Sequence, residues 1–118
     1  MSNIDKGKEG ENRATALLKE AGFEIIERNY HYGHGEIDII AKDGEFLVFV
    51  EVKTRTSDTF GSPLYAVTRG KQKQIARVAQ GYLYEKKIEN VPCRFDVIGV
   101  EFIGGQARLE HIPNAFTL

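Results

Sequence analysis

Two apolar runs, residues 35–42 and 45–54, stand on either side of Asp43-Gly44 and constrain the fold more than any other feature of this chain. Both runs are rich in Ile, Val, Phe and Leu, which are typical of strands. An Asp-Gly pair between two such runs indicates a two-residue turn. The sequence therefore predicts an antiparallel β-hairpin over residues 35–54.

The turn fixes which residues of this hairpin face each other. With the Asp-Gly pair in the turn, Asp38 faces Phe49, and Glu36 faces Glu51. Asp38 then lies diagonal to Glu51, with Cβ atoms roughly 7 to 8 Å apart, which lets two carboxylates converge on one ion. Glu36 opposite Glu51 would add a repulsion that a cation relieves.

Side chains alternate across a strand, so the hairpin has two different faces. One face carries only apolar residues, namely Ile37, Ile39, Ala41, Phe46, Val48, Val50 and Val52. The other face carries Glu36, Asp38, Ile40, Leu47, Phe49, Glu51 and Lys53. We expect the first face to be core. The second could be the solvated side of a ribbon, but its three large apolar residues favour partial burial.

A buried ion is costly unless it is paired or bound to a metal. Asp38 and Glu51 therefore predict a site for a hard divalent cation, Mg²⁺ or Mn²⁺. Mg²⁺ needs few protein carboxylates, because water and phosphate oxygens complete its coordination shell. Lys53 lies on the same face, where it could orient an attacking water or offset charge developing on a phosphoryl group.

The rest of the chain predicts an α/β fold in the order helix, three strands, helix, two strands. The other expected elements are a helix ending near Ala21, a strand over 23–30, a helix from the cap Thr68 to about Lys87, and a terminal hairpin of strands 93–103 and 107–112. Residues 56–63 predict a loop, in which Ser62-Pro63 could open a short helical turn. A length of 118 residues with 42% hydrophobic residues predicts one domain over residues 1–118.

Composition and charge narrow the function classes. Cys93 is the single cysteine, so an internal disulfide and a cysteine-based zinc site are excluded. The sequence has no long apolar run or signal-like start, and we expect a cytoplasmic protein with no membrane partner. Charge is uneven, with six basic residues against one acidic residue over 69–87, and five acidic against one basic over 36–51. A basic segment thus accompanies an acidic strand pair.

Asp38, twelve intervening residues and then Glu51-Val52-Lys53 resemble the PD-(D/E)XK nuclease signature. The resemblance implies a restriction-endonuclease-like αβββαβ core, a mixed sheet flanked by helices, with Asp38 and Glu51 on a divalent metal and Lys53 assisting the nucleophile. The segments GENRATALLKEAGFEIIERNY, GEIDIIA, VFVEVKTR and RFDVIGV more narrowly resemble the bacterial YraN-like proteins, which are similar to archaeal Holliday-junction resolvases. Ile37 stands where these nucleases often have Pro.

Glu11 lies three residues before Ala14 and seven before Leu18, which places it on the inward stripe of the first helix. The resemblance to resolvases implies that Glu11 completes the metal site. The alternative is a partly exposed side chain that favours the positive end of the helix dipole.

The second helix has a polar face opposite its apolar stripe. This face carries Lys73, Arg77, Gln80, Tyr84 and Lys87. The basic residues could follow a phosphate backbone, and Tyr84 could stack on a base. Gln80 and Tyr84 also resemble the Q-xxx-Y element of RecB-type nucleases. A plain solvated helix face is the alternative, and it is the simpler explanation.

Four further residues lie near the predicted strand ends. Arg28 and Arg55 could clamp phosphates or could be surface residues. His31 and His34 are expected in a turn with a loop role, because a zinc pair would need two more ligands nearby.

These features predict a metal-dependent DNA endonuclease that could act on branched or structured DNA. One alternative is a nucleic-acid-binding module that has the fold without the activity. Another is a protein-interaction domain that uses the edge of its terminal hairpin, where an open strand could also support a homodimer.

Overall fold

The computed structural model describes residues 3–56 and 61–117, and these form the predicted order of elements. The elements are α1 (Asn3–Glu20), β1 (Glu24–Tyr32), β2 (Gly35–Asp43), β3 (Phe46–Arg55), the short 3-10 helix η1 (Pro63–Ala66), α2 (Arg69–Glu85), β4 (Cys93–Ile103) and β5 (Gln106–Ile112). Residues 57–60 of the predicted loop lie outside the described residues. Within the described ranges, no helix is long and apolar enough to cross a membrane.

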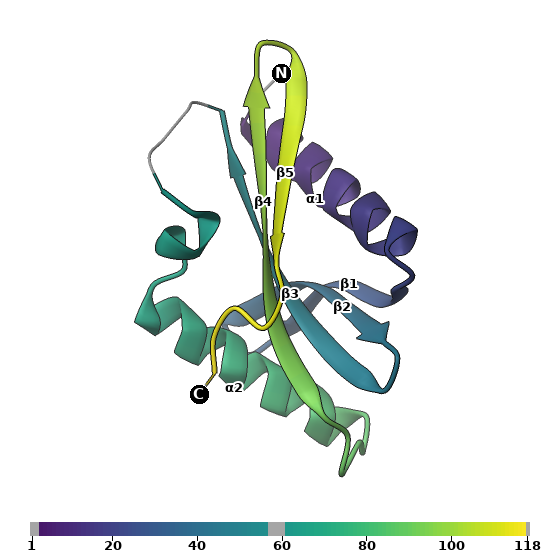
Figure 1. The fold of residues 1–118 in the computed structure, drawn as a ribbon. Coiled ribbons are helices and arrows are strands. Elements are labelled where there is room, and N and C mark those ends of the chain that lie inside the picture. Colours follow the sequence, from purple (N-terminus) through teal and green to yellow (C-terminus); the bar gives the residue numbers. More distant parts are fainter. Residues whose placement is uncertain (1–2, 57–60, 118) are drawn as a thin grey trace.

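The strands form one five-stranded sheet in the order β1-β2-β3-β4-β5. β3 and β4 are parallel, and the other neighbours are antiparallel. Parallel strands need a crossover connection, which α2 supplies between β3 and β4. Helix α1 lies against one face of the sheet and α2 against the other (Figure 1). The result is a mixed sheet between two helices, consistent with the predicted restriction-endonuclease-like core.

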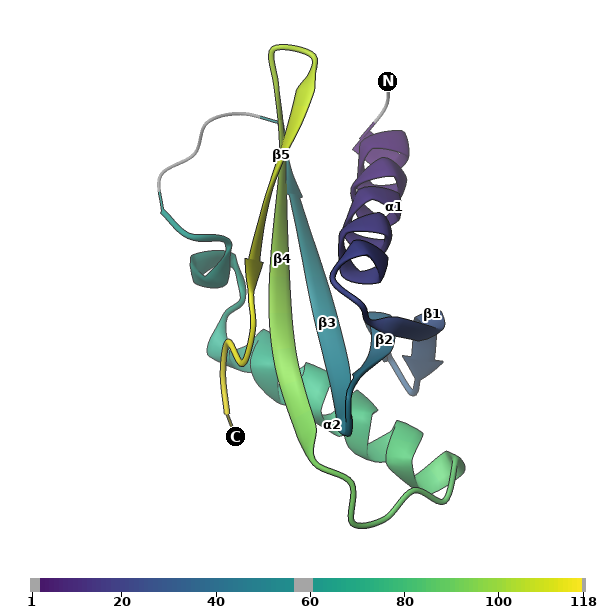
Figure 2. The same cartoon turned by 45° about the vertical axis from the view of Figure 1, so that its right-hand side comes forward.

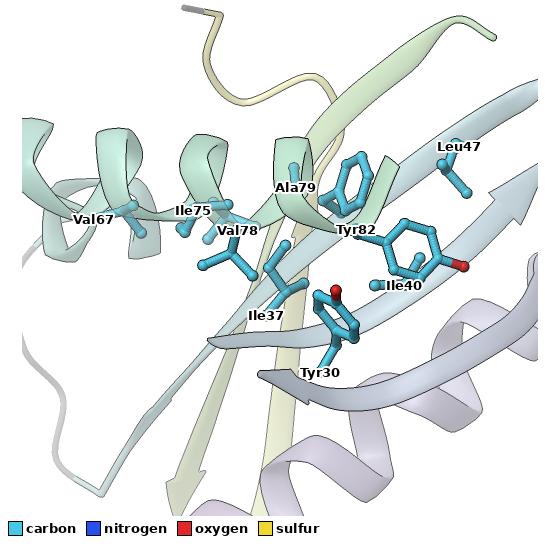
Figure 3. Packing of buried hydrophobic residues seen from close by; sticks show 11 residues of the cluster. Tyr30, Ile37, Ile40, Leu47, Val67, Ile75, Val78, Ala79 and Tyr82 are labelled. Carbon is cyan, nitrogen blue, oxygen red and sulfur yellow. The ribbon is translucent and has the colours of Figure 1, made fainter. Parts of the chain in front are cut away.

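Each face of the sheet has its own apolar core. The core between α2 and the sheet consists of Tyr30, Ile37, Ile40, Leu47, Phe49, Val67, Ile75, Val78, Ala79, Tyr82 and Val97 (Figure 3). The core between α1 and the sheet consists of Ala14, Leu18, Ile39, Ala41, Val48, Val50, Ile98 and Val100. The chain therefore buries apolar side chains on both faces of the central strands, as expected for strands covered by helices on both sides.

The prediction that Ile37 shares a face with Ile39 is wrong. Ile37 packs under α2 and Ile39 under α1. Pairing between β2 and β3 ends at Ile39 and Val50, and β2 then continues beside β1 alone. Figure 2 shows β1 and β2 swinging away from β3. Beyond Ile39, β2 follows β1 alone, so the position of β3 no longer fixes the side on which Ile37 is buried.

The predicted hairpin exists, but its turn is one residue further along the chain. Asp43 pairs with Phe46, so Gly44 and Glu45 are the turn residues. Gly44 has a φ of 60° and Glu45 has no positive φ, which is the pattern of a type II′ turn. A type I′ turn at Asp43-Gly44 would require a positive φ at Asp43 as well, which glycine tolerates and aspartate adopts less easily.

Candidate metal and nucleic-acid site

Asp38 and Glu51 come together where β2 separates from β3. They are the first residues beyond the last paired positions, Ile39 and Val50. Both are buried, with exposed fractions of 8% and 5%. Asp38 Oδ2 accepts a hydrogen bond of 2.7 Å from the backbone N–H of Val52. The Asp38 carboxylate thus serves as the acceptor for a β3 amide at the point where the strand pairing has stopped.

The two carboxyl groups strongly affect each other. Burial raises the pKa of Asp38 to about 8, and the negative charge of Glu51 and a hydrogen bond with Glu51 act in the same direction. The hydrogen bond from Val52 acts the other way but does not outweigh them. In the absence of a cation, this upward shift favours a proton on the carboxyl pair. A bound divalent cation would take over the role of this proton.

Two lysines contact the same oxygen of Glu51. Lys53 Nζ lies 3.8 Å from Glu51 Oε2, and Lys71 Nζ lies 3.6 Å from it. Lys53 follows Glu51 on β3, as predicted, whereas Lys71 belongs to the first turn of α2. The Thr68 side chain caps this turn by accepting a hydrogen bond of 3.2 Å from the Lys71 backbone N–H.

Sequence reasoning missed Lys71, although the chain contains a signal for it. Lys71 lies four residues before Ile75, which is 1% exposed and belongs to the buried stripe of α2. A residue four positions before an inward-facing residue points to the same side of the helix. A lysine at the start of an apolar stripe thus indicated a cation directed at the sheet.

Glu11 lies beside the carboxylate pair but has its own partners. Its Oε1 accepts a hydrogen bond of 2.9 Å from Asn29 Nδ2 and lies 3.7 Å from Arg28 Nη2. Besides burial and Glu51, the charge of Glu11 also raises the pKa of Asp38. Among the described residues, no three His, Cys, Asp or Glu side chains are grouped closely enough to hold a metal ion. The preformed part of the candidate site is therefore the Asp38–Glu51 pair.

A close contact between α1 and β3 sets the position of Glu11. A Cβ atom added at Gly10 would clash with Thr54 Oγ1, so glycine allows the helix to approach the strand directly. Thr54 follows Lys53 on β3. Helix α1 is thus seated next to the strand that carries Glu51 and Lys53, and Glu11 is the next residue of the helix.

Glu36 does not join Asp38 and Glu51, contrary to the prediction that it faces Glu51. It pairs with His31 of β1, and its Oε2 lies 2.9 Å from His31 Nε2. The shifted turn places Asp38, in place of Glu36, at the level of Glu51. In addition, β2 has left β3 at this position and pairs only with β1. His31 is therefore a strand residue, which contradicts its predicted turn position, whereas His34 does lie in the turn after β1.

The polar face of α2 is exposed, as predicted. Lys73, Arg77, Gln80 and Tyr84 are all exposed, and Tyr84 is 80% exposed. Beside this face runs an open groove of about 640 Å³, which we call the α2 groove. It is lined by Arg69, Gln72, Lys73, Ala76, Arg77, Gln80 and Thr117. Three of these side chains are basic and none is acidic.

The other two predicted phosphate contacts have partners within the protein. Arg28 donates a hydrogen bond of 2.9 Å to Asn12 Oδ1 in addition to its contact with Glu11. Arg55 lies 3.4 Å from Glu101 Oε1. These arginines connect β1 with α1 and β3 with β4.

A second buried carboxylate, Asp96, belongs to a separate network. Arg94 binds both of its oxygens at 2.9 and 3.1 Å, and His111 Nε2 lies 2.8 Å from Oδ2. The backbone N–H of Asn114 donates a further bond of 2.9 Å. Burial alone would raise the pKa of Asp96, but these hydrogen bonds outweigh it and lower the pKa. Since every partner stabilises the ionised form, this network is structural.

The chain is similar over most of its length to proteins of one family. A model described as "Uncharacterised protein family UPF0102" matches residues 10–100. A UPF0102 protein of Geobacter metallireducens is 46% identical, covering 100% of this chain and 97% of the relative. A UPF0102 protein of Syntrophus aciditrophicus is 47% identical, covering 98% and 91%.

Among solved structures, Pyrococcus furiosus SfsA in complex with Ca²⁺ matches with 14% identity and a TM-score of 0.37, covering 95% of this chain and 64% of that one. The family match covers most of the chain and the curated relatives match it nearly end to end. The chain therefore belongs to the UPF0102 family, the YraN-like group that its motifs indicated.

Proposed function

We propose that this protein is a metal-dependent endonuclease that hydrolyses phosphodiester bonds in DNA. The observation that supports the proposal is the buried Asp38–Glu51 pair with the Lys53 ammonium 3.8 Å from Glu51 Oε2. Two carboxylates and a lysine at the end of a strand pairing combine a cation site with a positive group for phosphate. The similarity to archaeal Holliday-junction resolvases makes branched DNA the first substrate to test.

The donor set fits a hard divalent cation. Asp38 and Glu51 offer carboxylate oxygens, which are the ligands that Mg²⁺ and Mn²⁺ prefer. Burial and mutual repulsion raise the pKa of Asp38 to about 8, so the pair gains when a cation replaces the proton. Mg²⁺ commonly takes one or two protein carboxylates together with water and phosphate oxygens. Glu11 would be a third ligand if its side chain left Asn29 and Arg28.

The chemistry that such a cation supplies when bound is activation of a water molecule and neutralisation of charge on the phosphoryl oxygens. Asp38 and Glu51 would hold it in place between β2 and β3. Lys53, whose side chain is 32% exposed, can reach a phosphoryl oxygen from the opening of the site and stabilise the negative charge that develops there. In-line attack on phosphorus needs this positioning and charge stabilisation more than it needs a covalent intermediate.

The α2 groove would bind a further stretch of the DNA backbone, on the side of α2 opposite Lys71. Arg69, Lys73 and Arg77 place three positive charges along one side of the helix whose first turn also contacts Glu51 through Lys71. The net charge of the chain is −1, so DNA binding depends on this local concentration of positive charge.

The test is a cleavage screen with Mg²⁺ and Mn²⁺ on linear, nicked, flapped and four-way DNA. The parent should cleave at least one substrate only when a cation is present, and Asp38→Asn with Glu51→Gln should abolish cleavage. Asp43→Asn is the matched control, because it makes the same chemical change on the same strand at a carboxylate that pairs with Arg94. DNA binding without cleavage of any substrate would instead identify a non-catalytic nucleic-acid-binding module.

A further inference from the structure

We propose that Lys71 holds Glu51 in the cation-free protein and moves to a DNA phosphate when a divalent cation takes its place. This inference rests on the proposed function and assigns a role in it to Lys71, which belongs to α2 and contacts Glu51 of β3. Lys71 Nζ is 3.6 Å from Glu51 Oε2, slightly closer than Lys53 Nζ at 3.8 Å.

The charges around Glu51 explain why a cation would displace Lys71. Two ammonium groups share one carboxylate oxygen of a side chain that is 6% exposed. A divalent cation binding that oxygen would bring two more positive charges against both lysines. Like charges a few ångströms apart repel strongly in a partly buried site, so at least one ammonium must move.

Lys71 differs from Lys53 in the element that carries it, because the two side chains are exposed to the same degree, 31% and 32%. The Thr68 cap fixes the backbone of Lys71, and its long flexible stem allows the ammonium to leave Glu51. Its helix also carries Arg69 and Lys73, which line the α2 groove. Lys71 starts on the sheet-facing side of this helix, so an ammonium released from Glu51 would stay beside the cation site and contact the phosphate bound there.

Lys73 provides a matched control. It lies two residues further along the same helix, which places it about 200° around the helix axis from Lys71. Lys73 is exposed and lines the α2 groove, whereas Lys71 contacts Glu51. Lys71→Met and Lys73→Met thus remove the same charge from opposite sides of one turn.

The first measurement is Mn²⁺ binding by calorimetry. Lys71→Met should bind Mn²⁺ about fivefold more tightly than the parent, which is the scale of removing one positive charge close to the cation. Lys73→Met should bind Mn²⁺ as the parent does. Equal Mn²⁺ affinity for Lys71→Met and the parent would overturn the proposal.

The second measurement is binding of a labelled DNA duplex in Ca²⁺ or in EDTA at several salt concentrations. In Ca²⁺, Lys71→Met should bind DNA several-fold more weakly than the parent, with a salt slope lower by about one, because one phosphate contact is lost. In EDTA, Lys71→Met should bind like the parent. Lys73→Met should weaken binding equally in both conditions.

Lys71→Arg keeps the positive charge and should retain the Ca²⁺-dependent DNA affinity, even if Lys71→Met proves poorly folded. If Lys71 only neutralises Glu51, the difference in DNA affinity between Lys71→Met and the parent will be the same in Ca²⁺ and in EDTA. That result would refute the proposal. Neither measurement uses cleavage. The outcome for Lys71 is therefore separate from the outcome of the cleavage screen for the proposed function.

Discussion

Asp38→Asn should make the cation-free protein more stable at neutral pH, and the gain should grow as the pH rises. Burial raises the pKa of Asp38 from 3.8 to about 8. Between these values the folded parent binds more protons than the unfolded parent, so its stability falls with rising pH. Asparagine has no charge to bury, and its side-chain oxygen can still accept the hydrogen bond from Val52.

The size of the effect follows from the same pKa shift. Each pH unit between the two pKa values costs the folded parent about 1.4 kcal/mol relative to a neutral side chain. From pH 5 to pH 7, the stability difference between Asp38→Asn and the parent should therefore grow by up to about 3 kcal/mol. In a domain of this size, that corresponds to roughly 10 °C in Tm.

The assay is urea unfolding of both proteins in EDTA at pH 5, 6 and 7. Comparing the variant with the parent at each pH removes the contribution of all other titrating groups. A stability difference that stays constant from pH 5 to pH 7 would show that Asp38 is already ionised at pH 5, and the explanation would fail. Asp43→Asn is the control, and an equal trend in both variants would assign the effect to the substitution itself. Adding Mg²⁺ should stabilise the parent more than Asp38→Asn.

Three further predictions concern other residues. Lys53→Met should reduce cleavage by at least about a hundredfold and leave Mn²⁺ binding by calorimetry in place, because Lys53 acts on the phosphoryl charge and does not hold the cation. Lys73→Ala with Arg77→Ala should weaken DNA binding and lower the salt slope by about one to two without changing sequence preference, whereas unchanged slopes would make the helix face a plain solvated surface. Asp96→Asn should destabilise the fold by about 3 kcal/mol in urea unfolding at pH 7, because Arg94 loses its buried partner. The pKa of Asp96 in the folded protein lies below the ordinary 3.8. The stability difference between parent and variant should therefore shrink as the pH falls below 3.8 and through the pKa of folded Asp96.

The order of the elements could be predicted because each element carries a local signal. Thr68 caps α2 with its own side chain, and Ser62 does the same for η1 by accepting a hydrogen bond from the Leu64 N–H. Gly104 and Gly105 both have positive φ, at 58° and 77°, as a two-residue turn requires. Such signals act within a few residues and do not depend on the rest of the fold.

The hairpin register could not be predicted from its local sequence. Gly44 can take a positive φ as either residue of a two-residue turn, and both choices leave the same side chains on the same faces. The observed turn moves Asp38 from a diagonal position to the level of Glu51. The alternation pattern alone could not distinguish these two registers.

Contacts between side chains that lie far apart in the sequence could not be predicted either. Lys71 of α2 contacts Glu51 of β3, and His111 of β5 contacts Asp96 of β4. Neither pair has a spacing that marks it in the sequence. Charged residues near apolar stripes indicate that a partner exists, but the topology decides which one.

The hydrogen bond from Val52 to Asp38 has a consequence for how sequence variation at position 38 should be interpreted. An acceptor is needed there to satisfy a β3 amide, whether or not the protein is an enzyme. A relative that had lost catalysis would thus be free to replace aspartate with asparagine, but alanine or leucine would leave that amide without its partner. A polar side chain at position 38 is therefore no evidence of catalysis. Only the retention of aspartate over asparagine would indicate selection for the charge.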